Sequence, residues 1–268
     1  MNRIDSAFEH KPIFMPYFPV GYPSLETSLD VIEALAKNGA DLIEVGLSFS
    51  DPLADGPVNQ KATQIALEKG ITVKKSLEAV TELRRRGVTI PLVLMGYYNP
   101  ILAFGLDKFI EQSRSAGVDG FIIPDLPLEE AGDFRHAGGK PTTTQADLPL
   151  IYMLAPTTPP DRMELISRQA QGFIYLVSVA GVTGVRNDLP IGLQELVARL
   201  RQHTSLPICV GFGISTPQQA KAVGAMADGV IVGSACVRTI GESTSPVDTA
   251  KEFAGSYRDA LTLLKIRS

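Results

Sequence analysis

One acidic residue, Glu44, lies inside the short apolar segment 42–45, and an acid-rich loop follows it. Side chains alternate between the two faces of a strand, so Glu44 shares a face with Leu42 and Gly46. A parallel strand covered on both faces is normally apolar throughout, because a carboxylate away from water is costly or loses its charge. The sequence therefore predicts that Glu44 is either paired with another group or used in chemistry.

Two aspartates, Asp51 and Asp55, occupy the loop after this segment. Asp51 precedes a proline and Asp55 precedes a glycine, and aspartates at such positions commonly form turns by bonding their own backbone. We keep this turn-forming interpretation for Asp51. Asp55 can also face the same cavity as Glu44, and two acids in different environments can take opposite roles in proton transfer.

Glycine-rich turns follow several of the later apolar segments. The turn 211–215 (Gly-Phe-Gly-Ile-Ser) leads into Thr216-Pro217, a typical helix start, and Gly233-Ser234 opens another helix. Glycines let a phosphate approach backbone N–H groups, and a helix N-terminus favours an anion. Either turn alone can be an ordinary loop, but together they favour a phosphorylated small molecule. The segment 181–184 could complete this cradle or act as a lid.

Aromatic residues near the expected strand ends could line a pocket for a flat apolar group, although each can equally be core or rim packing. These residues are Tyr17, Tyr97, Tyr175 and Phe212.

Composition argues against several other classes of protein. The net charge of -4 gives no broad electrostatic footprint for nucleic acid, and we interpret Arg84-Arg85-Arg86 as a solvated helix end. The three histidines are far apart and the two cysteines lack metal-type spacing, which argues against a zinc site or a histidine-based triad. The N-terminus is too polar for a signal peptide, so we expect a soluble, cytoplasmic protein with reduced thiols.

Short apolar segments alternate with helical periodicity along the chain, which indicates βαβ units and a parallel sheet. We expect eight strands, at 14–19, 42–45, 92–95, 120–123, 150–154, 173–177, 208–210 and 230–232. Helical periodicity is clearest at 25–37, 73–86 and 193–202. Eight units favour a (β/α)8 barrel of the TIM-barrel type over a doubly wound sheet, with residues 1–268 as a single domain.

Three further features are expected around this barrel. A short helix at 4–8 precedes the first strand, and an extra helix at 58–68 follows the second. The helix after the fourth strand is expected to start near Leu128 and to end early, because the Gly/Pro/Thr-rich stretch 137–146 disfavours helix.

A set of motifs closely resembles the tryptophan synthase alpha chain family. The motifs are Glu44-Val-Gly with the segment 49–57 (Phe-Ser-Asp-Pro-Leu-Ala-Asp-Gly-Pro), Met95-Gly-Tyr-Tyr-Asn-Pro100, Pro124-Asp-Leu-Pro127, Gly181-Val-Thr-Gly184, the turn 211–215 and Gly233-Ser234. The resemblance runs from near the N-terminus to past Arg238. It implies an α/β barrel that cleaves indole-3-glycerol phosphate to indole and glyceraldehyde 3-phosphate, a carbon–carbon lyase reaction in tryptophan biosynthesis that needs no metal or organic cofactor.

The resemblance also implies roles for particular residues. Glu44 falls on the family's proton-transferring glutamate, and Asp55 on the aspartate beside the indole nitrogen. Thr183 falls on the lid threonine that closes onto that aspartate. The phosphate contacts fall on Gly184, Gly213, Gly233 and Ser234, and the indole pocket on Tyr17, Tyr97, Tyr175, Phe212 and Ile231.

Family membership further implies an α2β2 complex with a pyridoxal-phosphate beta chain, contacted through residues 50–57 and 98–100. Two departures stand out: Tyr17 occupies a position that is Phe in some members, and the stretch 137–146 replaces a regular helix. Two other functions stay open at this stage. The chain could mainly activate its partner, or it could be a barrel isomerase of another phosphorylated metabolite.

Overall fold

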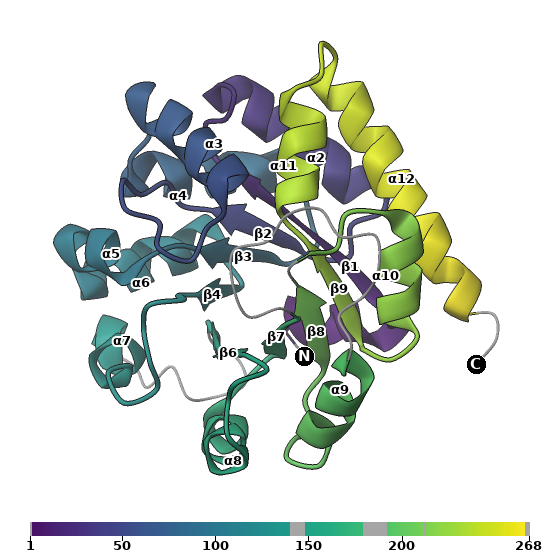
Figure 1. Cartoon of the computed structure of the whole chain (residues 1–268). Helices are drawn as coiled ribbons and strands as arrows, with labels where there is room; N and C mark the ends of the chain where they lie inside the picture. The colour runs from purple at the N-terminus through teal and green to yellow at the C-terminus, as the bar shows by residue number, and fades with distance from the viewer. Residues whose placement is uncertain (1, 140–147, 179–191, 212, 266–268) are drawn as a thin grey trace.

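The computed structural model of this chain is a barrel made of a parallel sheet, with helices around it (Figure 1). The structure describes residues 2–139, 148–178, 192–211 and 213–265. Strand pairing follows the order β5-β4-β3-β2-β1-β9-β8-β7-β6. The strands are β1 (Ile13–Pro19), β2 (Ile43–Gly46), β3 (Leu92–Met95), β4 (Gly120–Ile122), β5 (Leu150–Ile151), β6 (Met153–Leu154), β7 (Ile174–Val177), β8 (Ile208–Gly211) and β9 (Gly229–Val232).

The two ends of this strand order belong to one segment of chain. β5 pairs with β4, β6 pairs with β7, and Tyr152 lies between the two pieces. The ring of strands therefore closes through residues 150–154, which the sequence predicts as a single strand. Within the described ranges, eight segments of chain supply the strands, and the predicted (β/α)8 barrel is confirmed.

Helices surround the barrel on its outer side (Figure 1). They are α1 (Arg3–Ala7), α2 (Leu25–Asn38), α3 (Pro57–Glu68), α4 (Val73–Arg85), α5 (Tyr98–Phe104), α6 (Leu106–Ala116), α7 (Gly132–His136), α8 (Pro160–Gln169), α9 (Leu193–Arg201), α10 (Pro217–Gly224), α11 (Ser234–Gly241) and α12 (Pro246–Lys265), with 3₁₀ turns at Phe8–His10 and Ala137–Gly139. Within the described ranges, none of the helices combines the length and apolar character needed to cross a membrane.

Local sequence explains the first turns of α2 and α4. The hydroxyl of Ser24 accepts the backbone N–H of Thr27, and the hydroxyl of Thr72 accepts that of Lys75, which satisfies donors that have no partner within the helix. The apolar positions recur at helical spacing and are buried against the barrel. These two helices, α9, the N-terminal helix α1 and the extra helix α3 all lie where the sequence predicts them, within one or two residues.

The predicted start of α7 near Leu128 is wrong. The helix begins at Gly132, and the residues before it form tight turns in which the N–H of Glu130 bonds the carbonyl of Pro127 at 3.1 Å. This bond spans three residues instead of four, so it closes a turn and not a helix. The expected loop at 137–146 lies mostly outside the described residues.

Three aspartates tie together the N-terminal ends of neighbouring strands. Each lies just before a strand and accepts the backbone N–H at the start of an adjacent strand: Asp41 from Phe14 at 2.8 Å, Asp119 from Leu92 at 2.8 Å, and Asp228 from Ile208 at 2.9 Å. Charged acceptors make strong bonds to backbone donors. The carboxylates therefore fix the register of three strand pairs at the end of the barrel opposite the expected active site.

The interpretation of Arg84-Arg85-Arg86 as a solvated helix end is wrong for two of the three residues. The side chain of Arg84 is only 14% exposed and pairs with Asp119, while it also donates to the carbonyls of Gly117, Val88 and Ile90. Arg86 is 18% exposed and pairs with four acids, whereas Arg85 is 75% exposed. The planar guanidinium with its five donors explains why arginine can be buried here.

Replacing Asp119 with alanine should destabilise the fold by about 3 kcal/mol, because the buried Arg84 guanidinium and the Leu92 N–H would both lose an acceptor. Urea unfolding of the wild type and variant measures this difference. Asp259→Ala is the control, since its carboxylate is 74% exposed and should change stability by less than about 0.5 kcal/mol. Equal effects of the two substitutions would contradict a structural role for the Asp119 contacts.

Candidate active site

Glu44 lies in the interior of the barrel. It is the register partner of Tyr17 on β1 and of Val93 on β3, so the three residues face the same side of the sheet. Its charge also acts on Tyr175 of β7, which belongs to the other half of the strand ring. Glu44 therefore points into the barrel and away from the helices, as the proton-transfer hypothesis requires.

Burial controls the protonation of Glu44. Only 3% of the residue is exposed, and within the described part of the chain no lysine or arginine pairs with it. Loss of hydration, with a smaller contribution from the charge of Asp55, raises the pKa of Glu44 from 4.5 to about 8. The side chain is consequently a neutral acid near pH 7, able to donate a proton.

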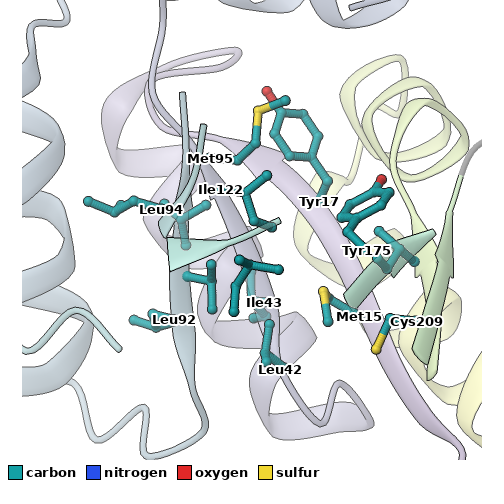
Figure 2. Close-up of a cluster of buried hydrophobic side chains, with 14 of the residues drawn as sticks. Met15, Tyr17, Leu42, Ile43, Leu92, Leu94, Met95, Ile122, Tyr175 and Cys209 are labelled. Carbon is teal, nitrogen blue, oxygen red and sulfur yellow. The ribbon is translucent and has the colours of Figure 1, made fainter. Parts of the chain in front are cut away.

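Two tyrosines, from β1 and β7, lie near this acid, and each fits against a glycine. A Cβ atom added to Gly46 would lie 2.4 Å from the Tyr17 hydroxyl, and one added to Gly211 would lie 2.5 Å from the Tyr175 hydroxyl. In the view of Figure 2 the ring of Tyr17 lies beside Met95, the last residue of β3, and the ring of Tyr175 lies between Tyr17 and Cys209. Glycine is thus required where each ring crosses the neighbouring strand, at the C-terminal end of the barrel.

Asp55, in the loop before α3, is held by two side-chain donors. The Tyr97 hydroxyl donates to its Oδ2 at 2.8 Å, and the amide of Asn59 donates to its Oδ1 at 3.2 Å. The same hydroxyl of Tyr97 accepts the backbone N–H of Ala54 at 3.0 Å, which fixes its direction. Burial raises the pKa of Asp55, and the two hydrogen bonds oppose this rise by stabilising its charged form.

The other sequence-predicted residues separate into two groups. Asp51 is exposed and bonds Ser50, so it does not join the buried acids. The side chains of Tyr17, Tyr97 and Tyr175 are all buried next to Glu44 or Asp55. Ile231 pairs in register with Met15, two residues before Tyr17, and therefore lies one layer deeper in the barrel. Thr183, Gly184 and Phe212 lie outside the described residues.

The two glycine turns differ in the backbone donors they leave available. At the start of α10 the carboxamide oxygen of Gln219 already accepts the N–H groups of Ser215 and Thr216, at 2.8 and 3.2 Å. At the start of α11, by contrast, Gly233 is the N-cap and no side chain of the described residues caps the helix. The α11 N-terminus is therefore the better place for an anion. The Thr216-x-x-Gln219 spacing is a recognisable capping box, which the sequence analysis missed.

Gly233 connects this turn with the acids. A Cβ atom added to it would lie 3.9 Å from Asn59 and 3.9 Å from the Cβ of Tyr17, so its vacant side faces the interior between α3 and β1. Gly213 has a φ of +76°, a conformation that favours glycine, in the turn after β8. Fold and site together define a barrel with two buried carboxyl groups in its interior, beside a turn suited to an anion, which is an arrangement typical of barrel enzymes that use acid–base chemistry.

Comparison with known proteins narrows this class to one family. The family model described as "Tryptophan synthase alpha chain" matches residues 5–261. The alpha chain of Chloroflexus aurantiacus is 48% identical over 98% of both chains. A crystal structure of the alpha chain from Legionella pneumophila superposes with a TM-score of 0.85 at 38% identity, covering 98% of each chain. Tryptophan synthase from M. tuberculosis, in its aminoacrylate-bound form, gives a TM-score of 0.85 at 31% identity, covering 97% of this chain and 100% of that one.

The chain belongs to the tryptophan synthase alpha chain family. The family identification made from the motifs is confirmed.

Replacing Glu44 with glutamine should stabilise the fold in a pH-dependent way. The pKa of Glu44 lies near 8 in the folded state, and its ordinary value is near 4.5. Between these pH values Glu44 ionises in the unfolded chain, which lowers the free energy of the unfolded state, while it stays protonated in the folded chain. Wild-type stability should therefore fall, relative to the variant, as pH rises from about 4.5 to 8. The difference should reach on the order of 5 kcal/mol above pH 8.

Urea unfolding of both proteins at pH 5, 7 and 9 measures this difference, and the other titrating groups cancel in the comparison. A gap that is the same at all three pH values would mean that Glu44 ionises normally in the folded protein.

Proposed function

We propose that this chain is the alpha subunit of tryptophan synthase and cleaves indole-3-glycerol phosphate to indole and glyceraldehyde 3-phosphate. Glu44 is the proton-transferring residue, and Asp55 stabilises the indole ring. The observation that carries this proposal is the buried Glu44, neutral at pH 7, in the same barrel interior as a hydrogen-bonded Asp55. Family membership supplies the substrate.

The reaction follows from the protonation states of the two acids. Protonated Glu44 gives its proton to indole C3, and the carboxylate of Asp55 stabilises the positive charge that develops on the ring N–H. The Glu44 carboxylate then takes the proton of the side-chain hydroxyl next to C3. The carbon–carbon bond breaks, its electron pair returns to the ring, and indole and the aldehyde are released with Glu44 protonated again.

The substrate-binding residues form the remainder of the proposed site. Tyr17, Tyr97, Tyr175, Phe212 and Ile231 hold the indole ring; Gly184, Gly213, Gly233 and Ser234 hold the phosphate, with Thr183 in the lid. Support comes from the burial of the three tyrosines and from the α11 N-terminus, which is uncapped by any side chain in the part of the chain that the structure describes. Residues 1–268 act as one domain, which is supported by a single apolar core that extends from Ile4 to Leu261.

We further propose that the chain works in a cytoplasmic α2β2 complex with a tryptophan synthase beta chain. The relative from M. tuberculosis is named as tryptophan synthase, and both cysteines here are free thiols, which suits a reducing compartment. The contact includes residues 50–57 and 98–100. Large apolar side chains are exposed there and nearby: Leu53 is 88% exposed and Leu102 is 47% exposed.

Glu44→Gln should lower the rate of indole release by the lone chain at least about a thousandfold, since glutamine can neither give nor take the proton. Binding of indole-3-propanol phosphate, which lacks the side-chain hydroxyls, should survive because that contact needs no proton transfer. Indole production and analogue affinity are the two measurements. Asp51→Asn, in the loop that follows β2, is the matched control, and the lone chain carrying it should keep its activity because Asp51 is exposed.

The same assays separate the alternative roles. A wild-type chain that releases no indole, either alone or together with a beta chain, would refute the lyase assignment. Retained cleavage in Glu44→Gln would refute the role of Glu44 alone. If the chain served only to activate its partner, the complex would form tryptophan from serine and indole but not from serine and indole-3-glycerol phosphate, and Glu44→Gln would leave this pattern unchanged.

Leu53→Ser should weaken binding to the beta chain at least about tenfold while indole release by the lone chain stays within a factor of about two, because the side chain is almost fully exposed. Titration calorimetry with a beta chain measures the affinity. Leu165→Ser on α8, where the leucine is 43% exposed away from the proposed contact, is the control. Equal affinity in all three proteins would place the contact elsewhere.

A further inference from the structure

Asn59, in the first turn of α3, contacts the Asp55 carboxylate directly. Its Nδ2 donates to Oδ1 of Asp55 at 3.2 Å, while Tyr97 holds the other carboxylate oxygen. An ionised carboxylate only accepts hydrogen bonds, so the NH2 end of the amide must face Asp55 and the carbonyl end must face away. The direction of the amide is therefore coupled to the charge on Asp55.

The carbonyl oxygen of Asn59 is buried and, among the described residues, has no hydrogen-bond partner. Buried side-chain oxygens in folded proteins almost always have a donor. A purely structural asparagine could satisfy both ends of its amide with neighbouring backbone groups. Asn59 instead donates its N–H to the Asp55 carboxylate, and its carbonyl oxygen accepts no hydrogen bond from the described residues. Such an unsatisfied buried group is typical of a residue with a functional role.

Asn59 also lies between the two halves of the proposed site. Its Nδ2 is 3.9 Å from the position that a Cβ of Gly233 would occupy, and α3 packs against α11 at this end of the barrel (Figure 1). The side chain thus reaches from the acid that faces the indole ring to the turn proposed for the phosphate. Among the acids in the interior, Asp55 would therefore be the one most directly affected by a substitution of Asn59.

We propose that Asn59 is a positioning residue for the reaction, whose amide keeps the Asp55 carboxylate charged and correctly directed beside the indole ring. This inference rests on the proposed function, because it assigns Asn59 a task in that reaction. It applies to the hydrogen bond from Nδ2 to Oδ1 and not to the general stability of α3.

Loss of this bond has a specific signature in the pH profile. Asn59 stabilises only the charged form of Asp55, so its removal should raise the pKa of Asp55 further above the ordinary value. The reaction needs Asp55 ionised and Glu44 protonated, so kcat/KM should be bell-shaped, with an acid limb from Asp55 and a basic limb from Glu44 near pH 8. Asn59→Leu should move the acid limb up by about one pH unit and leave the basic limb in place.

The experiment compares wild type, Asn59→Leu and Gln60→Leu by kcat/KM for indole release between pH 5 and 9. Gln60 is a matched control: its amide, one residue along the same helix, donates to the backbone carbonyl of Asp55 at 2.8 Å and does not touch the carboxylate. Its loss should leave the acid limb unmoved. The titration of the Asp55 carboxyl carbon by NMR, assigned by its absence in Asp55→Asn, reports the pKa without any need for turnover.

The outcomes are distinct. An upward shift of the acid limb and of the NMR titration in Asn59→Leu alone supports the proposal. A uniform loss of kcat/KM at all pH values, or the same shift in Gln60→Leu, overturns it. A wild type that releases no indole overturns the proposed function instead, and the NMR titration then still decides whether Asn59 controls Asp55.

Discussion

Exclusion of water from one carboxyl group is the constraint on which the site depends. Glu44 would be an ordinary, ionised glutamate on the surface, and its pKa rises to about 8 mainly because the barrel interior removes its hydration. The fold must supply apolar and aromatic neighbours on every side without bringing a cation close enough to restore the charge. Asp55 differs in this respect, because two directed donors meet its carboxylate and favour the charged form. One short loop thus separates two acids with different proton affinities.

The closed ring of strands makes this environment possible. Strand register places Tyr17 beside Glu44, and the ring brings Tyr175 to face the same interior from β7. The ring of each tyrosine fits only because the residue beside it, Gly46 or Gly211, has no side chain. These two glycines are therefore required by the size of the neighbouring rings and not by a chemical role. At the other end of the barrel, aspartates such as Asp41 and Asp119 hold the strand starts in register. The candidate catalytic groups therefore lie at one end of the barrel, and the contacts that fix strand register lie at the other.

The sequence predicts those features that depend on local pattern. Alternating apolar segments and helical periodicity predict the barrel, and a lone glutamate in an apolar strand predicts the acid. Features that depend on contacts formed when the chain folds were missed or misread. Arg84 looks like a surface cation until Gly117 and Asp119 are brought next to it, and Asn59 looks like an ordinary helix residue until the loop folds Asp55 against it. The predicted start of α7 was wrong because a sequence that forms turns with three-residue hydrogen bonds resembles a sequence that starts a helix.

The segment 150–154 has a consequence for how the barrel opens. It is divided between two neighbours, with a two-residue strand on each side of Tyr152, so this seam carries fewer ladder hydrogen bonds than the four-residue pairing of β2 with β3. Stretches with sparse hydrogen bonding unfold locally at lower free energy than the rest of a protein. The backbone amides of residues 150–154 should accordingly exchange with solvent deuterium sooner than those of β1 to β3. Cleavage of the chain within this segment would separate β5 from β6 and so open the ring of strands into a curved sheet.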